Sequence, residues 1–96
     1  MIQFAIIAQD AKDDQALARR TAAREAHLDN VKNLKVSGNF IKAAAMLNND
    51  GQMCGSIMLM QFETREQFDQ YLAAEAYVVK KVWGEIDIKE VKVAPI

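Results

Sequence analysis

The chain has 96 residues, of which 51% are hydrophobic, and its 12 basic and 13 acidic side chains leave a net charge of −1. This length predicts one domain spanning residues 1–96, because a second independent core has no room. The balanced charge, with no basic stripe, argues against nucleic acid as a partner. The apolar runs are shorter than the roughly 18 residues of a membrane span and no signal peptide is recognisable, so we expect a cytoplasmic protein with no membrane partner.

The first half of the chain predicts a strand, a long helix and a second strand. Ile2–Ala8 is short, β-branched and aromatic, which is typical of a strand. A helical pattern then runs from about Asp14 through Lys35 and ends near Gly38, because glycine suits a helix C-terminus. The segment Asn39–Leu47 predicts the next strand.

The second half begins with a polar loop, residues 48–52, which leads into a strand predicted over Cys54–Phe62. Thr64 and Gln67 then form a capping box, which predicts a second helix through about Leu72 and a short helical turn after it.

The chain closes with a charged, β-branched strand predicted over Glu85–Val93. Its apolar positions change phase partway along, and we expect a β-bulge near Lys89 or Glu90 to cause this change. The order strand, helix, strand, strand, helix, strand predicts an α+β protein of the ferredoxin-like βαββαβ type. In that arrangement the helices cover one face of an antiparallel sheet.

The other face of this sheet is predicted to be apolar as well. Met58 and Met60 point one way along their strand, whereas Ile57 and Leu59 point the other way. Two helices on one side leave the second face bare, so the pattern predicts a homodimer that packs through the open sheet face.

The long helix carries the only histidine, His27. On a helical wheel Arg24 shares the arc of Leu17 and Leu28, with Arg20 and His27 on its flank. Burying a guanidinium without a partner costs several kcal/mol, so we interpret Arg24 and His27 as the border of a small polar pocket. The alternatives are a partly buried structural histidine and arginines that extend along the helix edge to solvent.

Several short motifs occur together in an order that resembles the YCII (YciI-like) family of small dimeric proteins. They are Ala8-Gln9-Asp10, Arg24-Glu25-Ala26-His27-Leu28, Gly55-Ser56, Phe62-Glu63 and Glu75-Ala76-Tyr77. The resemblance covers nearly the whole chain. It implies a ferredoxin-like dimeric α/β barrel, similar in architecture to muconolactone isomerases, in a family whose members include a dehydrochlorinase.

The resemblance also implies a catalytic pair. His27 would be the acid or base, and Glu75 its partner, in the place where the family carries the aspartate of an Asp-Pro-Tyr-like stretch. This chain departs from that pattern, because Glu75 is one methylene longer than aspartate and no proline follows it.

Together these features predict a small enzyme that isomerises or eliminates on a small anionic, lactone-like or enol-type metabolite. Arg24 would hold the carboxylate or oxyanion of the substrate, and Ser56 and Tyr77 would donate hydrogen bonds. We expect no metal and no organic cofactor, since neither a glycine-rich phosphate loop nor a ligand cluster is present. The alternatives are a non-catalytic dimeric module that binds a small metabolite or a partner, and a structural polar cluster at the dimer interface.

Overall fold

A computed structural model describes residues 1–96, and its elements follow the predicted order. They are β1 (Ile2–Asp10), α1 (Ala16–Val36), β2 (Phe40–Leu47), β3 (Met53–Phe62), α2 (Arg65–Ala74), α3 (Ala76–Val79) and β4 (Trp83–Val91). The short α3 is the helical turn expected after the second long helix.

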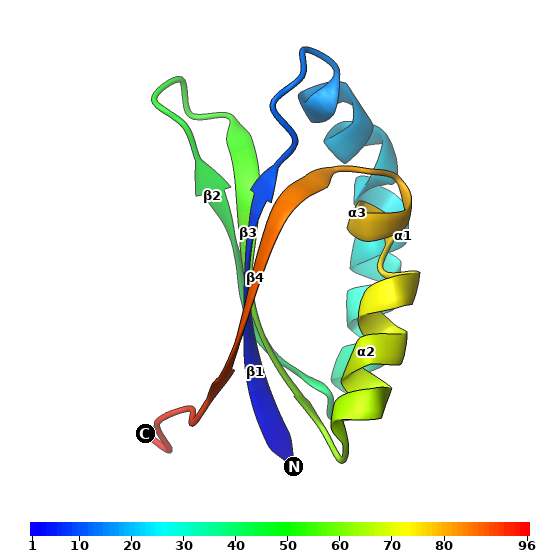
Figure 1. Ribbon diagram of the computed structural model, residues 1–96, viewed down its shortest axis with the longest axis vertical. Helices are drawn as coiled ribbons and strands as arrows, with labels where there is room; N and C mark the ends of the chain where they lie inside the picture. Colours follow the sequence, from blue (N-terminus) through cyan, green and yellow to red (C-terminus); the bar gives the residue numbers. More distant parts are fainter.

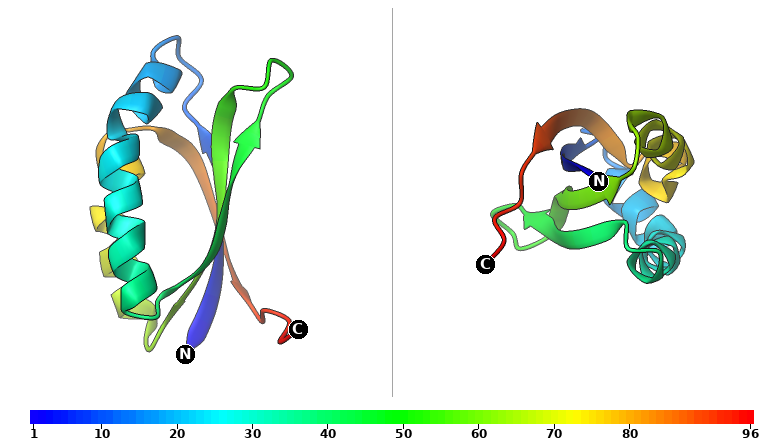
Figure 2. Two further views of the ribbon diagram at one scale, coloured as in Figure 1. Left: turned by 180° about the vertical axis from the view of Figure 1, so that it is seen from behind. Right: turned by 90° about the horizontal axis from the view of Figure 1, so that it is seen from below.

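The four strands form one twisted sheet in the order β2-β3-β1-β4, and every neighbouring pair is antiparallel. All three helices lie on the same side of this sheet (Figures 1 and 2). The predicted ferredoxin-like α+β arrangement is therefore confirmed.

The core lies between the sheet and the helices. Alternate side chains of β1 and β3, among them Phe4, Ile6, Met58 and Met60, point toward the helices and are almost fully buried. Phe68 of α2 meets them, stacked on Phe4 with ring centroids 4.2 Å apart. The period-2 pattern of the central strands thus positions the helix layer that carries the candidate site.

The helix ends follow local sequence signals. The Thr64 side chain accepts a hydrogen bond from the backbone N–H of Gln67 at 3.2 Å, as the capping box predicts. Gly38 follows α1 with φ +82°, a left-handed conformation that suits glycine. These two residues fix where α2 begins and where the chain turns from α1 into β2.

The opposite sheet face carries no helix (Figure 2). On that face β1 and β3 place Ala5 beside Leu59 and Ile7 beside Ile57. Ile57 is 39% exposed. An apolar strip therefore runs along the centre of the uncovered face, as the alternation in the sequence predicts.

The expected bulge near Lys89 and Glu90 is wrong. These two residues pair regularly with Ala5 and Phe4, and the β1–β4 register shifts only at the far end of the strand, beside Gly84. The change of phase has a simpler cause: Val91 pairs with Gln3 on the uncovered face at the end of the strand. No extra residue is needed to place it there.

None of the helices combines the length and the apolar composition needed to cross a membrane.

Candidate active site

A cavity of about 170 Å³ opens between α1 and the strands β2 and β3. Its polar lining consists of Arg20, Arg24, His27, Ser56 and Tyr77, and three consecutive alanines of β2 line the opposite wall. All predicted site residues except Glu75 line this cavity, and Glu75 lies directly behind His27.

His27 contacts Glu75 through a hydrogen bond between its Nδ1 atom and Oε1 of the carboxylate. His27 lies on the buried side of α1, and Glu75 is the single residue between α2 and α3, with no exposed surface. The structure thus brings together two residues that are 48 positions apart in the sequence. Their catalytic role stays a prediction.

The Glu75 carboxylate has further partners. Tyr71, one turn earlier in α2, donates its hydroxyl to Oε2 at 2.7 Å, and the Tyr77 backbone N–H points at Oε1 from 3.4 Å. Burial by itself would raise the pKa of the Glu75 carboxyl. The hydrogen bonds from His27, Tyr71 and the Tyr77 amide, together with the charge of the imidazole, outweigh burial and lower this pKa below its usual value of 4.5.

An ionised Glu75 determines which nitrogen of His27 remains free. A carboxylate only accepts hydrogen bonds, so the Nδ1 atom beside it carries a hydrogen. No hydrogen bond within the chain engages Nε2. Nε2 is therefore the atom of the imidazole that can give or take a proton at a ligand.

Tyr77 packs flat against His27, with ring centroids 4.0 Å apart and an interplanar angle of 12°. The Arg20 guanidinium lies 4.7 Å from the centroid of the same tyrosine ring. The Tyr77 hydroxyl is buried and has no hydrogen-bond partner, which is unusual for a buried polar group. The stacking of the Tyr77 ring on His27 fixes the plane of the imidazole.

Arg20, not Arg24, is the buried arginine of α1. Arg20 is 1% exposed and pairs with Asp10 of β1, with Nε 2.9 Å from the carboxylate, and it also donates to the Gly55 carbonyl at 2.6 Å. The predicted buried face of α1, centred on Leu17, Arg24 and Leu28, is therefore wrong. The buried residues of α1 are Ala16, Arg20, Ala23 and His27. Small alanines let this side approach the sheet, and Asp10 neutralises the buried Arg20 guanidinium.

Arg24 is exposed, and its Nη1 lies 3.1 Å from Sδ of Met53. It borders the cavity but has no carboxylate partner within 4.0 Å in the chain. Its guanidinium thus remains available to an anion that enters the cavity. The alternative in which Arg20 runs along the helix edge to solvent is excluded by its burial.

Ser56 of β3 lines the cavity and is 5% exposed. Its hydroxyl accepts hydrogen bonds from Nη2 of Arg20 at 2.6 Å and from the indole Nε1 of Trp83 at 3.1 Å. Gly55 must precede it, because a Cβ there would lie 2.6 Å from the Ala8 carbonyl oxygen.

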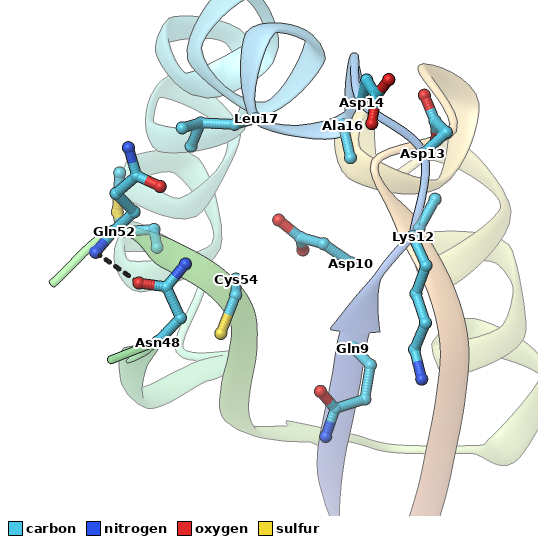
Figure 3. Close-up of a pocket in the computed structure, with 12 residues that line it drawn as sticks. Gln9, Asp10, Lys12, Asp13, Asp14, Ala16, Leu17, Asn48, Gln52 and Cys54 are labelled. Atoms are coloured by element: carbon cyan, nitrogen blue, oxygen red, sulfur yellow. Dashed lines mark hydrogen bonds between the residues drawn. The ribbon is translucent and has the colours of Figure 1, made fainter. Parts of the chain in front are cut away.

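A second cavity of about 270 Å³ lies at the end of the sheet, between the β1–α1 loop and the β2–β3 loop (Figure 3). Asp10 points into this space, and Cys54 lies on the β3 side of it (Figure 3). The Asp10 carboxylate is already bound by Arg20. Asp10 therefore serves as the ion-pair partner of the buried Arg20.

Sequence reasoning missed three features around the cavity. They are the contact of Asp10 with Arg20, the contact of Tyr71 with Glu75, and the burial of Arg20. Tyr71 and Glu75 are four apart at the end of a helix, a spacing that indicates contact and could have identified the pair. Asp10 and Arg20 meet across the β1–α1 loop, and no local pattern predicts that meeting. No group of three or more His, Cys, Asp or Glu side chains is placed to hold a metal ion.

The model of the YCII-related domain matches residues 2–92 of the chain. Among curated proteins, no sequence matches it. The remaining comparisons concern solved structures.

One similar structure is 5-chloro-2-hydroxyhydroquinone dehydrochlorinase from Burkholderia phenoliruptrix AC1100, in complex with 2,5-dihydroxybenzoquinone. The TM-score is 0.82 at 18% identity, over 96% of this chain and 95% of that one. Two others are dimeric ferredoxin-like proteins. The one from Jannaschia sp. CCS1 has a TM-score of 0.55 at 13% identity, over 97% of this chain and all of that one. The one from an uncultured marine organism has a TM-score of 0.54 at 16% identity, over 98% and 99% of the two chains. At these identities the likeness shows the shared fold.

Proposed function

The chain belongs to the YCII-related domain family, and from that premise we propose that it is a small enzyme in which His27 moves a proton on a small, oxygen-bearing anionic substrate. The observation that carries this proposal is the buried His27–Glu75 hydrogen bond at the edge of a cavity, with Nε2 left free. The reaction class is isomerisation or elimination. Both begin when a base removes a proton, and an isomerisation also returns that proton, roles that an imidazole supports near neutral pH.

In this proposal Glu75 orients the imidazole and stabilises its charged form. Nε2 takes a proton from a carbon of the substrate or from a hydroxyl conjugated with the leaving group, and the electron pair of the broken C–H or O–H bond forms a new double bond. In an elimination these electrons expel the leaving group as an anion. A chlorinated hydroquinone would react in this way from its keto tautomer, in which the carbon that carries chlorine is tetrahedral. In an isomerisation the proton returns from Nε2 to a different carbon. Arg24 and the hydroxyls of Ser56 and Tyr77 bind the oxygen atoms of the substrate.

The dehydrochlorinase supports elimination as the first reaction to test, since it shares the fold over almost the whole chain. We propose 5-chloro-2-hydroxyhydroquinone as the trial substrate, with chloride release as the measurement. His27→Gln should lower kcat by at least about a hundredfold, because general acid–base catalysis typically contributes that much. Binding of 2,5-dihydroxybenzoquinone should change much less. Lys32→Gln, an exposed change on the same helix, is the control.

The test also separates the enzyme from the binding module. Turnover that survives His27→Gln unchanged would contradict the proposed role of the imidazole. A wild-type protein that binds 2,5-dihydroxybenzoquinone but converts neither the chlorinated compound nor a set of small lactones would favour the non-catalytic module.

We also propose that two copies of the chain pack through the uncovered sheet face. The apolar strip of Ala5, Ile7, Ile57 and Leu59 supports this arrangement, because an antiparallel sheet with one solvated face normally carries polar residues there. Two of the similar structures are described as dimeric ferredoxin-like proteins.

A further inference from the structure

The hydroxyl of Ser56 has unusual surroundings for a residue in a binding cavity. It receives two N–H groups, one from Arg20 and one from Trp83. A serine hydroxyl has two lone pairs that accept and one hydrogen that donates, whereas guanidinium and indole N–H groups only donate. Both acceptor positions of Ser56 are therefore occupied from inside the protein.

The remaining hydrogen of Ser56 has no acceptor within the chain, because no hydrogen bond has Ser56 Oγ as its donor. The cavity beside His27 is the open space that this residue borders. A group that already accepts twice gains nothing from another donor. The one bond that Ser56 can still form is a donation to an acceptor that enters the cavity.

We propose that Arg20 and Trp83 fix Ser56 as a one-way donor, so that the cavity selects a ligand with a carbonyl or oxyanion oxygen at Ser56 and disfavours one with an N–H group there. The inference rests on the proposed function for the identity of the cavity and adds what the ligand must present. Trp83 is a positioning residue, since it acts on the ligand through Ser56.

The Arg20 side chain is itself held in place. Asp10 binds its Nε, and the Gly55 carbonyl binds its Nη2, so the guanidinium cannot turn toward the ligand without losing both bonds. A positive charge 2.6 Å from the serine oxygen also polarises the O–H bond and strengthens its donation. Trp83 is 6% exposed and packs edge-on against Tyr77 with ring centroids 5.8 Å apart, which limits the movement of the indole.

A first experiment needs no ligand. Neutron diffraction from crystals of the full chain exchanged into D₂O locates the deuterium on Ser56 Oγ. We expect it to point into the cavity, with the deuterons of Arg20 and Trp83 directed at the oxygen. A Ser56 deuterium directed at a backbone carbonyl would overturn the inference and would leave the His27–Glu75 pair untouched.

A second experiment is a double-mutant cycle on the binding of 2,5-dihydroxybenzoquinone, measured by calorimetry. Ser56→Ala should weaken binding by about tenfold, the usual size for one hydrogen bond to a charged or strongly polar group. Trp83→Phe should weaken it by a few fold. In the Ser56→Ala background, Trp83→Phe should have no further effect, because the tryptophan acts through the serine.

Ser37→Ala is the matched control, since Ser37 is the only other serine of the chain and caps α1 far from the cavity. Additive losses in the cycle would show that Trp83 merely supports the structure and would overturn its positioning role. Undiminished binding by Ser56→Ala would overturn the donor assignment. A wild-type chain that does not bind the probe would contradict the proposed ligand class, and the neutron map alone would then decide the direction of the Ser56 hydroxyl.

Discussion

At the scale of single residues, Glu75 is held at both carboxylate oxygens. His27 and the Tyr77 amide engage Oε1, and Tyr71 engages Oε2. Burial and the negative charge of Glu75 raise the pKa of the Tyr71 hydroxyl far above its usual value of 10.0. This shift keeps the Tyr71 hydroxyl protonated, so that it donates to the Glu75 carboxylate.

Tyr71→Phe should lower the free energy of unfolding by about 1–3 kcal/mol, because it leaves one oxygen of a buried carboxylate without its donor. Urea titration followed by circular dichroism measures this loss. Tyr71 also meets Phe62 and Phe68, and phenylalanine keeps those ring contacts. An unchanged free energy of unfolding would mean that water replaces the hydroxyl at no cost.

The lowered pKa of Glu75 predicts an acid-sensitive fold. A carboxyl whose pKa is lower in the folded state stabilises that state above the unfolded pKa of about 4.5, and this stabilisation is lost as the pH falls through the folded pKa. The free energy of unfolding of the wild type should thus decrease below pH 4.5. In Glu75→Gln the same curve should be flatter, whereas the exposed Glu66→Gln should follow the wild type. A Glu75→Gln curve that parallels the wild type would contradict the shift.

At the scale of elements, local signals in the sequence predict most of the fold. The alternation of β3, the Thr64 cap and Gly38 each encode a structure within a few residues, and each lies where it is expected. The orientation of α1 was harder to predict. Arg20 and Arg24 are one turn apart, and what selects Arg20 for burial is Asp10 and the Gly55 carbonyl, which lie in other elements.

The Thr64 cap is testable with a matched pair, since the chain has two threonines. Thr64→Ala should cost about 1 kcal/mol, because the N–H of Gln67 loses its acceptor at the start of α2. Thr21→Ala, in the exposed middle of α1, should cost nothing or stabilise slightly, as alanine favours helix. Chemical denaturation of both variants measures the difference. Equal effects at the two sites would exclude a capping role for Thr64.

At the scale of the whole molecule, the N-terminal strand β1 lies inside the sheet and pairs with the C-terminal strand β4. The Gln3 side chain accepts from the Val93 N–H at 2.7 Å, and β1 pairs with both β3 and β4. We therefore propose that residues 1–96 unfold as one domain. The face of the sheet away from the helices belongs to this scale too, because we propose that a second copy of the chain covers its apolar strip.

Ile57→Lys should convert a dimer into a monomer, because it places a charge within the apolar strip. Size-exclusion chromatography with light scattering measures the mass. Val36→Lys is the control, since Val36 is 90% exposed at the end of α1 and lies away from that face. A wild-type monomer, or an Ile57→Lys protein that keeps the dimer mass, would exclude the proposed interface.

The position of Glu75 between two helices has a consequence for how such a chain can change during evolution. No flexible loop carries the carboxylate, since α2 ends at Ala74 and α3 begins at Ala76. Inserting or deleting one residue within α2 would turn the carboxylate by about 100° around the helix axis and separate it from His27. The Asn48–Gln52 loop, by contrast, can lengthen without disturbing the pair. Variation in chain length is therefore expected at the hairpin, while α2 keeps its number of residues.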